Sequence, residues 1–152
     1  MKEPLVSRIL RYSLYLIFCL GLCIILTLPM LLDIYSLYLY DSYSLHQGYR
    51  TFILAFLVLI GCLGLWVIAD LIFMLRTIST DPFLQRNVRA LKRIGAIALV
   101  IALLFFFKCL WYITFLTIVC GIVFLFCSLV IFTVGMLFAR AVQYKEENEL
   151  TI

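Results

Sequence analysis

One carboxylate stands inside an apolar stretch of this sequence and is its strongest candidate for chemistry. Asp70 lies six residues before Arg76, the next charge, so in a membrane-crossing helix it would lie roughly 9 Å inside the helix end. A carboxylate there is energetically unfavourable and by default marks a proton, ion or switch site. The structural alternatives are an ion pair with Arg93 or Arg140, or a carboxylate that remains hydrated near the headgroups. A transport pathway needs further polar groups near the membrane midplane, and the sequence places none beside Asp70.

The other reactive side chains do not assemble into a site. The six cysteines all fall in apolar segments, where cysteine usually acts as a small hydrophobic residue. Cys19 and Cys23 share a helix face, but a metal site needs more than two ligands, and the single histidine, His46, is distant in sequence. No nucleophile, base and orienting group converge. We predict no enzymatic activity, no cofactor and no metal site.

Composition indicates the elements that must position Asp70. Hydrophobic residues make up 66% of the 152 residues and charged residues 13%, so the chain needs a bilayer as its solvent. The uncharged runs 12–32 and 51–69 each suffice for one helical crossing, which takes roughly 20 residues. The run 94–139 carries a single charge and is long enough for two helices with a turn near residues 111–117. The prediction is an all-α polytopic membrane protein, a single domain in which four transmembrane helices form a compact bundle. The helices are expected at about 7–32, 48–77, 89–112 and 115–144.

The basic residues predict how these helices are oriented. Ten of the twelve lie at or beyond the helix ends on the side of the two chain termini, and only Arg50 and Lys108 lie toward the other side. The positive-inside rule then places both termini in the cytoplasm. The first apolar run is longer than a signal-peptide core and no A-x-A-like cleavage site follows it, so we expect a retained helix. The net charge of +4 reflects this topology, and we expect no direct nucleic-acid binding.

The segment between the first two helices, residues 33–48, is rich in Tyr and Ser. Tyr rings favour the membrane–water interface, so one interpretation is an aromatic belt on the outer leaflet. The other is a docking surface for an external peptide or lipid, because Tyr supplies contact area at little loss of entropy. The sequence leaves both open.

Small residues recur at helical spacing in three of the predicted helices. They let membrane helices approach closely, and a seven-residue repeat suits left-handed packing. The same residues can pack a compact bundle or form the seam of a homo-oligomer, in the simplest case a homodimer. They are Ala55, Cys62 and Ala69; Gly95, Ala98 and Ala102; and Gly121, Ser128 and Gly135.

The segment between the second and third helices is the most patterned part of the chain. Asp81 is a suitable N-cap, and Pro82 is favoured at the first position of a helix. Arg86, Arg89 and Arg93 then form a basic stripe, which fits an interfacial anchor near anionic lipid. The alternative is that the stripe forms half of a surface that binds a protein partner.

The last residues form an acidic tail that ends in an apolar, β-prone triplet. Glu146, Glu147 and Asn148 precede the triplet Leu150-Thr151-Ile152. The triplet can add a strand to the sheet edge of a partner or be bound through its carboxylate. Folding back onto the basic segment is the alternative.

Two of these segments carry a pattern that consists of Pro82-Phe83, Asn87, Leu91, Ile94-Gly95 and the tail 145–152. This pattern resembles a family of small bacterial four-helix membrane proteins, the domain of unknown function DUF2975, which includes YoaS-like proteins. The resemblance spans nearly the whole chain and implies a location in the bacterial cytoplasmic (inner) membrane. Family members are often encoded beside a small Cro/C1-type helix-turn-helix regulator. That association implies that the membrane protein governs the regulator.

We therefore expect a membrane-bound regulator or sensor, surrounded by the lipid bilayer, that binds a cytoplasmic helix-turn-helix regulator. The expected surface combines the stretch Asp81–Arg93, including Phe83 and Asn87, with the tail Glu146–Ile152. One alternative is a structural or assembly partner of a membrane complex that uses the small-residue faces. Another is a small transporter or immunity protein that uses Asp70.

Overall fold

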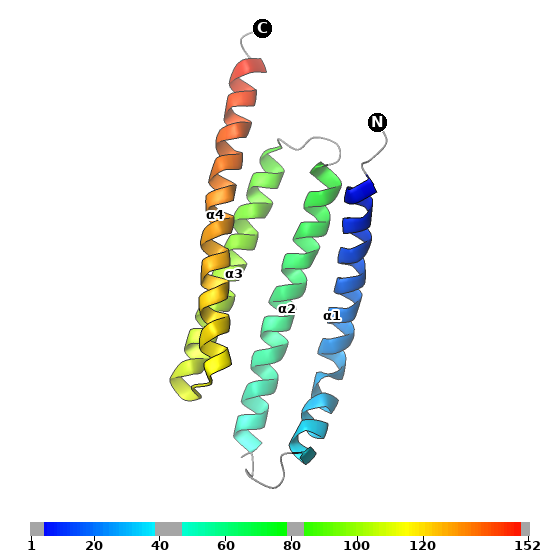
Figure 1. The fold of residues 1–152 in the computed structure, drawn as a ribbon, viewed down its shortest axis with the longest axis vertical. Helices are drawn as coiled ribbons and strands as arrows, with labels where there is room; N and C mark the ends of the chain where they lie inside the picture. Colours follow the sequence, from blue (N-terminus) through cyan, green and yellow to red (C-terminus); the bar gives the residue numbers. More distant parts are fainter. Residues whose placement is uncertain (1–4, 39–46, 79–83, 150–152) are drawn as a thin grey trace.

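The computed structural model describes residues 5–38, 47–78 and 84–149 and contains four long α-helices that run up and down in chain order (Figure 1). Each is long and apolar enough to cross a membrane, so the predicted all-α fold with four membrane helices is confirmed. We call the end of the molecule that carries both termini the terminal end, and the opposite end the distal end. The helices are α1 (Leu5–Tyr38), α2 (Gln47–Ile78), α3 (Gln85–Trp111) and α4 (Phe115–Glu149).

Two helices continue well beyond the ends that the apolar runs indicate. α1 passes residue 32 and ends at Tyr38, and α4 passes Tyr144 and ends at Glu149. The reason is that a bilayer limits only the apolar part of a helix, while its backbone hydrogen bonds continue into the interface. The extension of α1 places Asp33 in an ion pair with Arg50 of α2 at the distal end. The Tyr-rich segment is thus helical as far as Tyr38, and its residues 39–46 lie outside the described residues.

A short connection, residues 112–114, joins α3 to α4 within the predicted turn. The Tyr112 amide donates to the Lys108 carbonyl at 2.9 Å, which completes the last turn of α3. The Lys108 ammonium donates to the Thr117 hydroxyl at 3.1 Å and lies 5.4 Å from the centre of the Phe56 ring. This one cation therefore contacts both α4 and α2 at the distal end.

α3 and α4 form the most extensive helix pair, and small residues of both helices make the approach possible. Ser128 is fully buried, and its hydroxyl donates to the Gly95 carbonyl at 2.9 Å. Ala102 is fully buried as well. A Cβ on Gly121 would lie 3.2 Å from the Phe106 ring, closer than ordinary contact. The small-residue faces of the third and fourth predicted helices are therefore used inside the molecule.

The other two helix–helix contacts join only helices that are consecutive in the chain. At the α1–α2 seam, a Cβ on Gly61 would lie 2.9 Å from Ile25. The smaller α2–α3 seam contains an edge-to-face contact between Phe56 and Phe105, whose ring centres are 5.5 Å apart. Within the described ranges, no Cα pair within 8 Å joins α1 to α3 or α4, or α2 to α4. The molecule thus consists of two helical hairpins joined side by side through α2 and α3 (Figure 1).

Large apolar side chains cover the outside of this row of helices. Phe115 is 82% exposed, and Leu16, Leu129 and Leu137 are exposed along α1 and α4. Water-soluble proteins rarely expose contiguous apolar surface on this scale, whereas lipid tails solvate it. The chain is therefore a multi-pass membrane protein.

Gly121→Leu is expected to destabilise the α3–α4 hairpin, because a side chain at that position meets Phe106 and Phe105. Overpacking of this kind typically lowers the free energy of unfolding by about 1–3 kcal/mol, which thermal unfolding in detergent micelles would report as a lower midpoint. Gly64→Leu is the matched control, because nothing lies within 4 Å of a Cβ built there and both changes alter helix propensity alike. Equal midpoints for the two variants would contradict this account of the packing.

Candidate functional site

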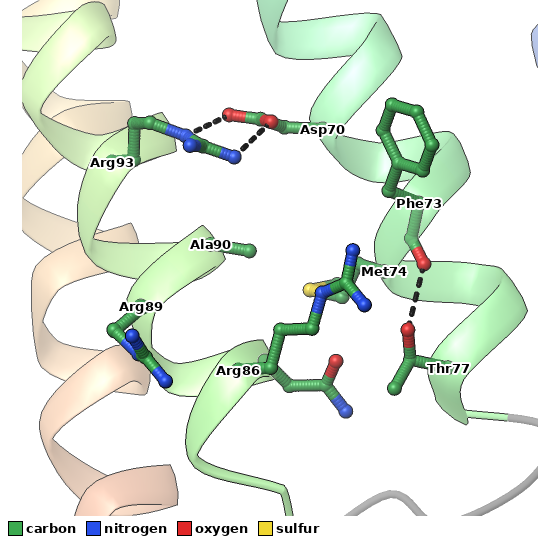
Figure 2. A pocket seen from close by; sticks show the side chains of 9 residues that line it. Asp70, Phe73, Met74, Thr77, Arg86, Arg89, Ala90 and Arg93 are labelled. Atoms are coloured by element: carbon green, nitrogen blue, oxygen red, sulfur yellow. Dashed lines mark hydrogen bonds and ion pairs between the residues drawn. The ribbon is translucent and has the colours of Figure 1, made fainter.

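The Asp70 carboxylate lies at the α2–α3 seam, where Arg93 of α3 binds it with two hydrogen bonds (Figure 2). Nε of Arg93 lies 2.6 Å from Oδ2 of Asp70, and a terminal guanidinium nitrogen donates to Oδ1. The Asp70 side chain is only 4% exposed, whereas the Arg93 side chain is 56% exposed. Of the two predicted partners, Arg93 is the one observed, and Arg140 is exposed on α4.

This geometry explains how an apolar helix tolerates a carboxylate. Two charge-assisted hydrogen bonds from one guanidinium are stronger than neutral ones and fix the relative position of both groups. Because the Arg93 side chain remains half exposed, it keeps access to headgroups or water, and only the carboxylate is fully desolvated. Asp70 therefore acts in this structure as a tie between α2 and α3, with both of its oxygens engaged.

A cavity of about 510 Å³ opens beside this ion pair, between α2 and α3. Figure 2 shows Arg86 extending across the opening toward Met74 and Thr77 of α2, while Arg93 binds Asp70 deeper between the helices. Three arginines and one aspartate line the cavity, so its formal charge is +2 (3 − 1). The predicted basic stripe thus becomes one wall of a cavity. The complete lining is Asp70, Phe73, Met74, Thr77, Arg86, Asn87, Arg89, Ala90 and Arg93.

α3 begins at Gln85, four residues before the expected start near residue 89 but after Pro82, the residue expected to open the helix. Leu84 occupies the N-cap position in extended conformation, with φ −100° and ψ 139°. The prediction that Asp81 caps this helix and Pro82 opens it is therefore wrong for α3; both residues, and Phe83, lie outside the described residues. Leu84 in extended conformation interrupts any helix that continues from Pro82, and the Asn87 amide donates to the Leu84 carbonyl at 2.9 Å to form the first turn of α3.

Asn87 is buried, which the sequence analysis missed. It is 3% exposed and lines the cavity, so it does not face outward as a partner-binding residue would. The spacing of Asn87 indicates its burial, because Asn87 lies seven residues before Ile94, on the same helix face, and Ile94 is also buried.

The end of α4 projects beyond its neighbour. Gly135 faces Leu91 of α3, and from there α4 continues fourteen residues to Glu149, whereas α3 extends only six residues back to Gln85. At about 1.5 Å per residue, α4 ends roughly 12 Å beyond the first residue of α3. Figure 1 shows this projection at the terminal end.

The projecting part of α4 is acidic and exposed. Glu146, Glu147 and Asn148 are all exposed, and the Gln143 amide donates to Glu147 at 3.1 Å one turn away. As far as Glu149 the tail is therefore a continuation of α4 and does not fold back onto the basic stripe. The triplet 150–152 lies outside the described residues.

The predicted partner surface is therefore divided between two sides of α3. The arginines line the side that faces α2, whereas Leu91 and Gly95 contact α4. The structure brings Asp70, Arg86, Asn87, Arg89 and Arg93 together in one cavity, and it leaves the acidic residues of α4 apart from them.

The described residues offer no cluster of metal ligands. No group of three or more His, Cys, Asp or Glu side chains within residues 5–38, 47–78 and 84–149 is placed to hold an ion. All six cysteines are free thiols on the apolar helices. The three arginines that line the cavity give it a chemistry suited to an anion.

Comparisons with protein-family models, with curated proteins and with solved structures find no match for this chain. The family resemblance of the segment 82–95 and of the tail therefore stays a prediction.

Arg93→Leu is expected to lower the free energy of unfolding by about 1–3 kcal/mol, because it leaves the Asp70 carboxylate buried without its partner. Asp70→Leu removes the buried charge itself, so the double variant should recover most of the loss. Unfolding of the four proteins in mixed micelles by a denaturing detergent completes the double-mutant cycle. Strictly additive effects would show that the pair does not tie α2 to α3.

Proposed function

We propose that this protein lies in a bacterial cytoplasmic membrane with both termini in the cytoplasm, and that it holds a helix-turn-helix regulator at the membrane surface. The excess of basic residues in the segments at the terminal end supports the orientation. The resemblance of the segment 82–95 and of the tail to the family described above supports the kind of partner. The protein is a binding protein in this proposal and catalyses no reaction.

The observation that carries the proposal is the projecting, acidic end of α4. A helix that only crosses the bilayer has no need of a further two turns beyond its neighbour. Glu146, Glu147 and Asn148 are exposed there, and α4 holds them on a helical extension of the α3–α4 hairpin. A helical end of this kind is a suitable contact for a partner in the cytoplasm.

Charge complementarity supports a DNA-binding partner. Residues 144–149 contain three Glu and one Lys, a net charge of −2 (1 − 3). DNA-binding domains present basic surfaces, so an acidic helix attracts the same surface that contacts DNA and competes with it. Such sequestration regulates transcription only if the membrane protein binds the regulator more tightly in one condition than in another.

The geometry favours the alternatives less. Asp70, on which a transporter or immunity protein would depend, has both carboxylate oxygens bound by Arg93. The small-residue faces of α3 and α4, on which an assembly partner or homo-oligomer would depend, are buried against each other. In the repeat of α2, Ala55 and Cys62 remain exposed.

A chain ending at Tyr144 is expected to lose the regulator, because it lacks the acidic end of α4. The measurement is crosslinked affinity purification from native membranes, with a small helix-turn-helix protein identified by mass spectrometry. A chain ending at Glu149 should retain this protein, and Glu146→Lys/Glu147→Lys should release it. Equal recovery by all chains, or recovery of membrane proteins alone, would overturn the proposal. Loss on removal of residues 150–152 alone would assign docking to the triplet instead of the helix.

Reporter fusions test the orientation separately. An enzyme that is active only outside the cytoplasm should be inactive when fused after Ile152 and active when inserted between residues 39 and 46. The reason is that the positive-inside rule keeps the basic segments in the cytoplasm. Activity in the reverse pattern would exclude a cytoplasmic regulator as partner.

A further inference from the structure

We infer that the cavity between α2 and α3 binds the phosphate of an anionic phospholipid, with Arg86 and Arg89 as the groups that contact the phosphate. This site is distinct from the projecting end of α4, and it stands whether or not that end binds a regulator.

The charges in the cavity are unbalanced. Arg93 and Asp70 neutralise each other in their hydrogen-bonded pair. Arg86 and Arg89 line the same cavity and are exposed, and within the described part of the chain neither forms a hydrogen bond or ion pair. Two guanidinium groups on one helical turn remain for an anion, and the planar guanidinium fork matches phosphate oxygens.

The opposite wall of the cavity favours a lipid over a free phosphate ion. Phe73, which is 54% exposed, and Met74 make the α2 wall partly apolar, and Ala90 adds an apolar residue on α3. A free phosphate gains nothing from apolar contact, whereas a phospholipid carries its phosphate and acyl chains in one molecule. The volume of about 510 Å³ also falls within the range of roughly 300–1,000 Å³ that is typical of small-molecule sites.

The depth of the cavity in the helices fits the same ligand. Asp70 lies six residues before Arg76, roughly 9 Å inside the end of the apolar stretch, and Arg86 lies nearer the terminal end (Figure 2). The cavity therefore spans the level at which phosphates give way to acyl chains. Anionic lipids are attracted to basic residues at this level.

The ion pair leaves uncompensated positive charge at only one end of the site. Arg93 is held by Asp70 at the deep end, so the uncompensated positive charge is confined to Arg86 and Arg89 nearer the headgroups. A lipid bound there contacts α2 through its acyl region and α3 through its phosphate. It therefore bridges the smaller seam that joins the two hairpins, and binding should stabilise the folded protein in proportion to lipid occupancy.

The test is native mass spectrometry of the full-length protein in a mild detergent, with phosphatidylglycerol, phosphatidylcholine or inorganic phosphate added. The variants are Arg86→Gln/Arg89→Gln and the control Arg140→Gln, which removes an exposed arginine of α4 outside the cavity. Thermal unfolding without added lipid shows whether each variant folds as the wild type does.

Wild type and Arg140→Gln are expected to retain a phosphatidylglycerol molecule through mild activation, and the double variant, which lacks two arginines, to bind it about thirtyfold more weakly. Phosphatidylcholine should bind less, and excess inorganic phosphate should not displace phosphatidylglycerol. Equal retention by the double variant and the control would overturn the proposal. Displacement by inorganic phosphate would assign the cavity to a free anion, and equal binding of phosphatidylcholine would exclude recognition of anionic lipid; either result overturns it.

Discussion

Hydrocarbon offers no hydrogen-bonding partner to a peptide group, and the structure follows from this constraint. Each backbone polar group inside the bilayer must be satisfied within its own helix, so the chain forms four helices longer than the apolar runs that require them. Lipid tails are as apolar as the side chains, so the helices associate through close packing and a few polar contacts. The buried hydrogen bond from Ser128 to the Gly95 carbonyl is such a contact.

The seams between the helices are unequal because small residues are distributed unequally. α3 and α4 bring Gly95, Ala102 and Ser128 to one interface, and they approach closely along much of their length. α2 and α3 meet through larger side chains, such as Phe56 and Phe105, so their backbones stay farther apart. The space that remains between them at the terminal end is the cavity, and the Asp70–Arg93 pair is the polar contact at its deep end.

Both proposed activities lie at the terminal end but on different sides of α3. The arginine-lined cavity faces α2, and the acidic extension belongs to α4, which packs on another side of α3. This separation follows from the helical period, because residues 86, 89 and 93 lie on one face of α3 whereas Leu91 and Gly95 lie on another. A change in lipid occupancy and a change in partner binding can therefore be measured independently.

The sequence by itself determined the features that depend on composition and local spacing. These are the number of membrane helices, the turn near Tyr112, the small-residue faces of α3 and α4, and the two candidate partners for Asp70. These features can be read along the chain, because the length of each apolar run and the spacing of its residues do not depend on which helices become neighbours. Only the tertiary structure decided that Arg93 and not Arg140 binds Asp70, that Asn87 is buried, and that α3 starts at Gln85. Each of these depends on which helices are neighbours and on their register. The free energy of a helix cap or of an exposed charge is too small to determine which helices pack together.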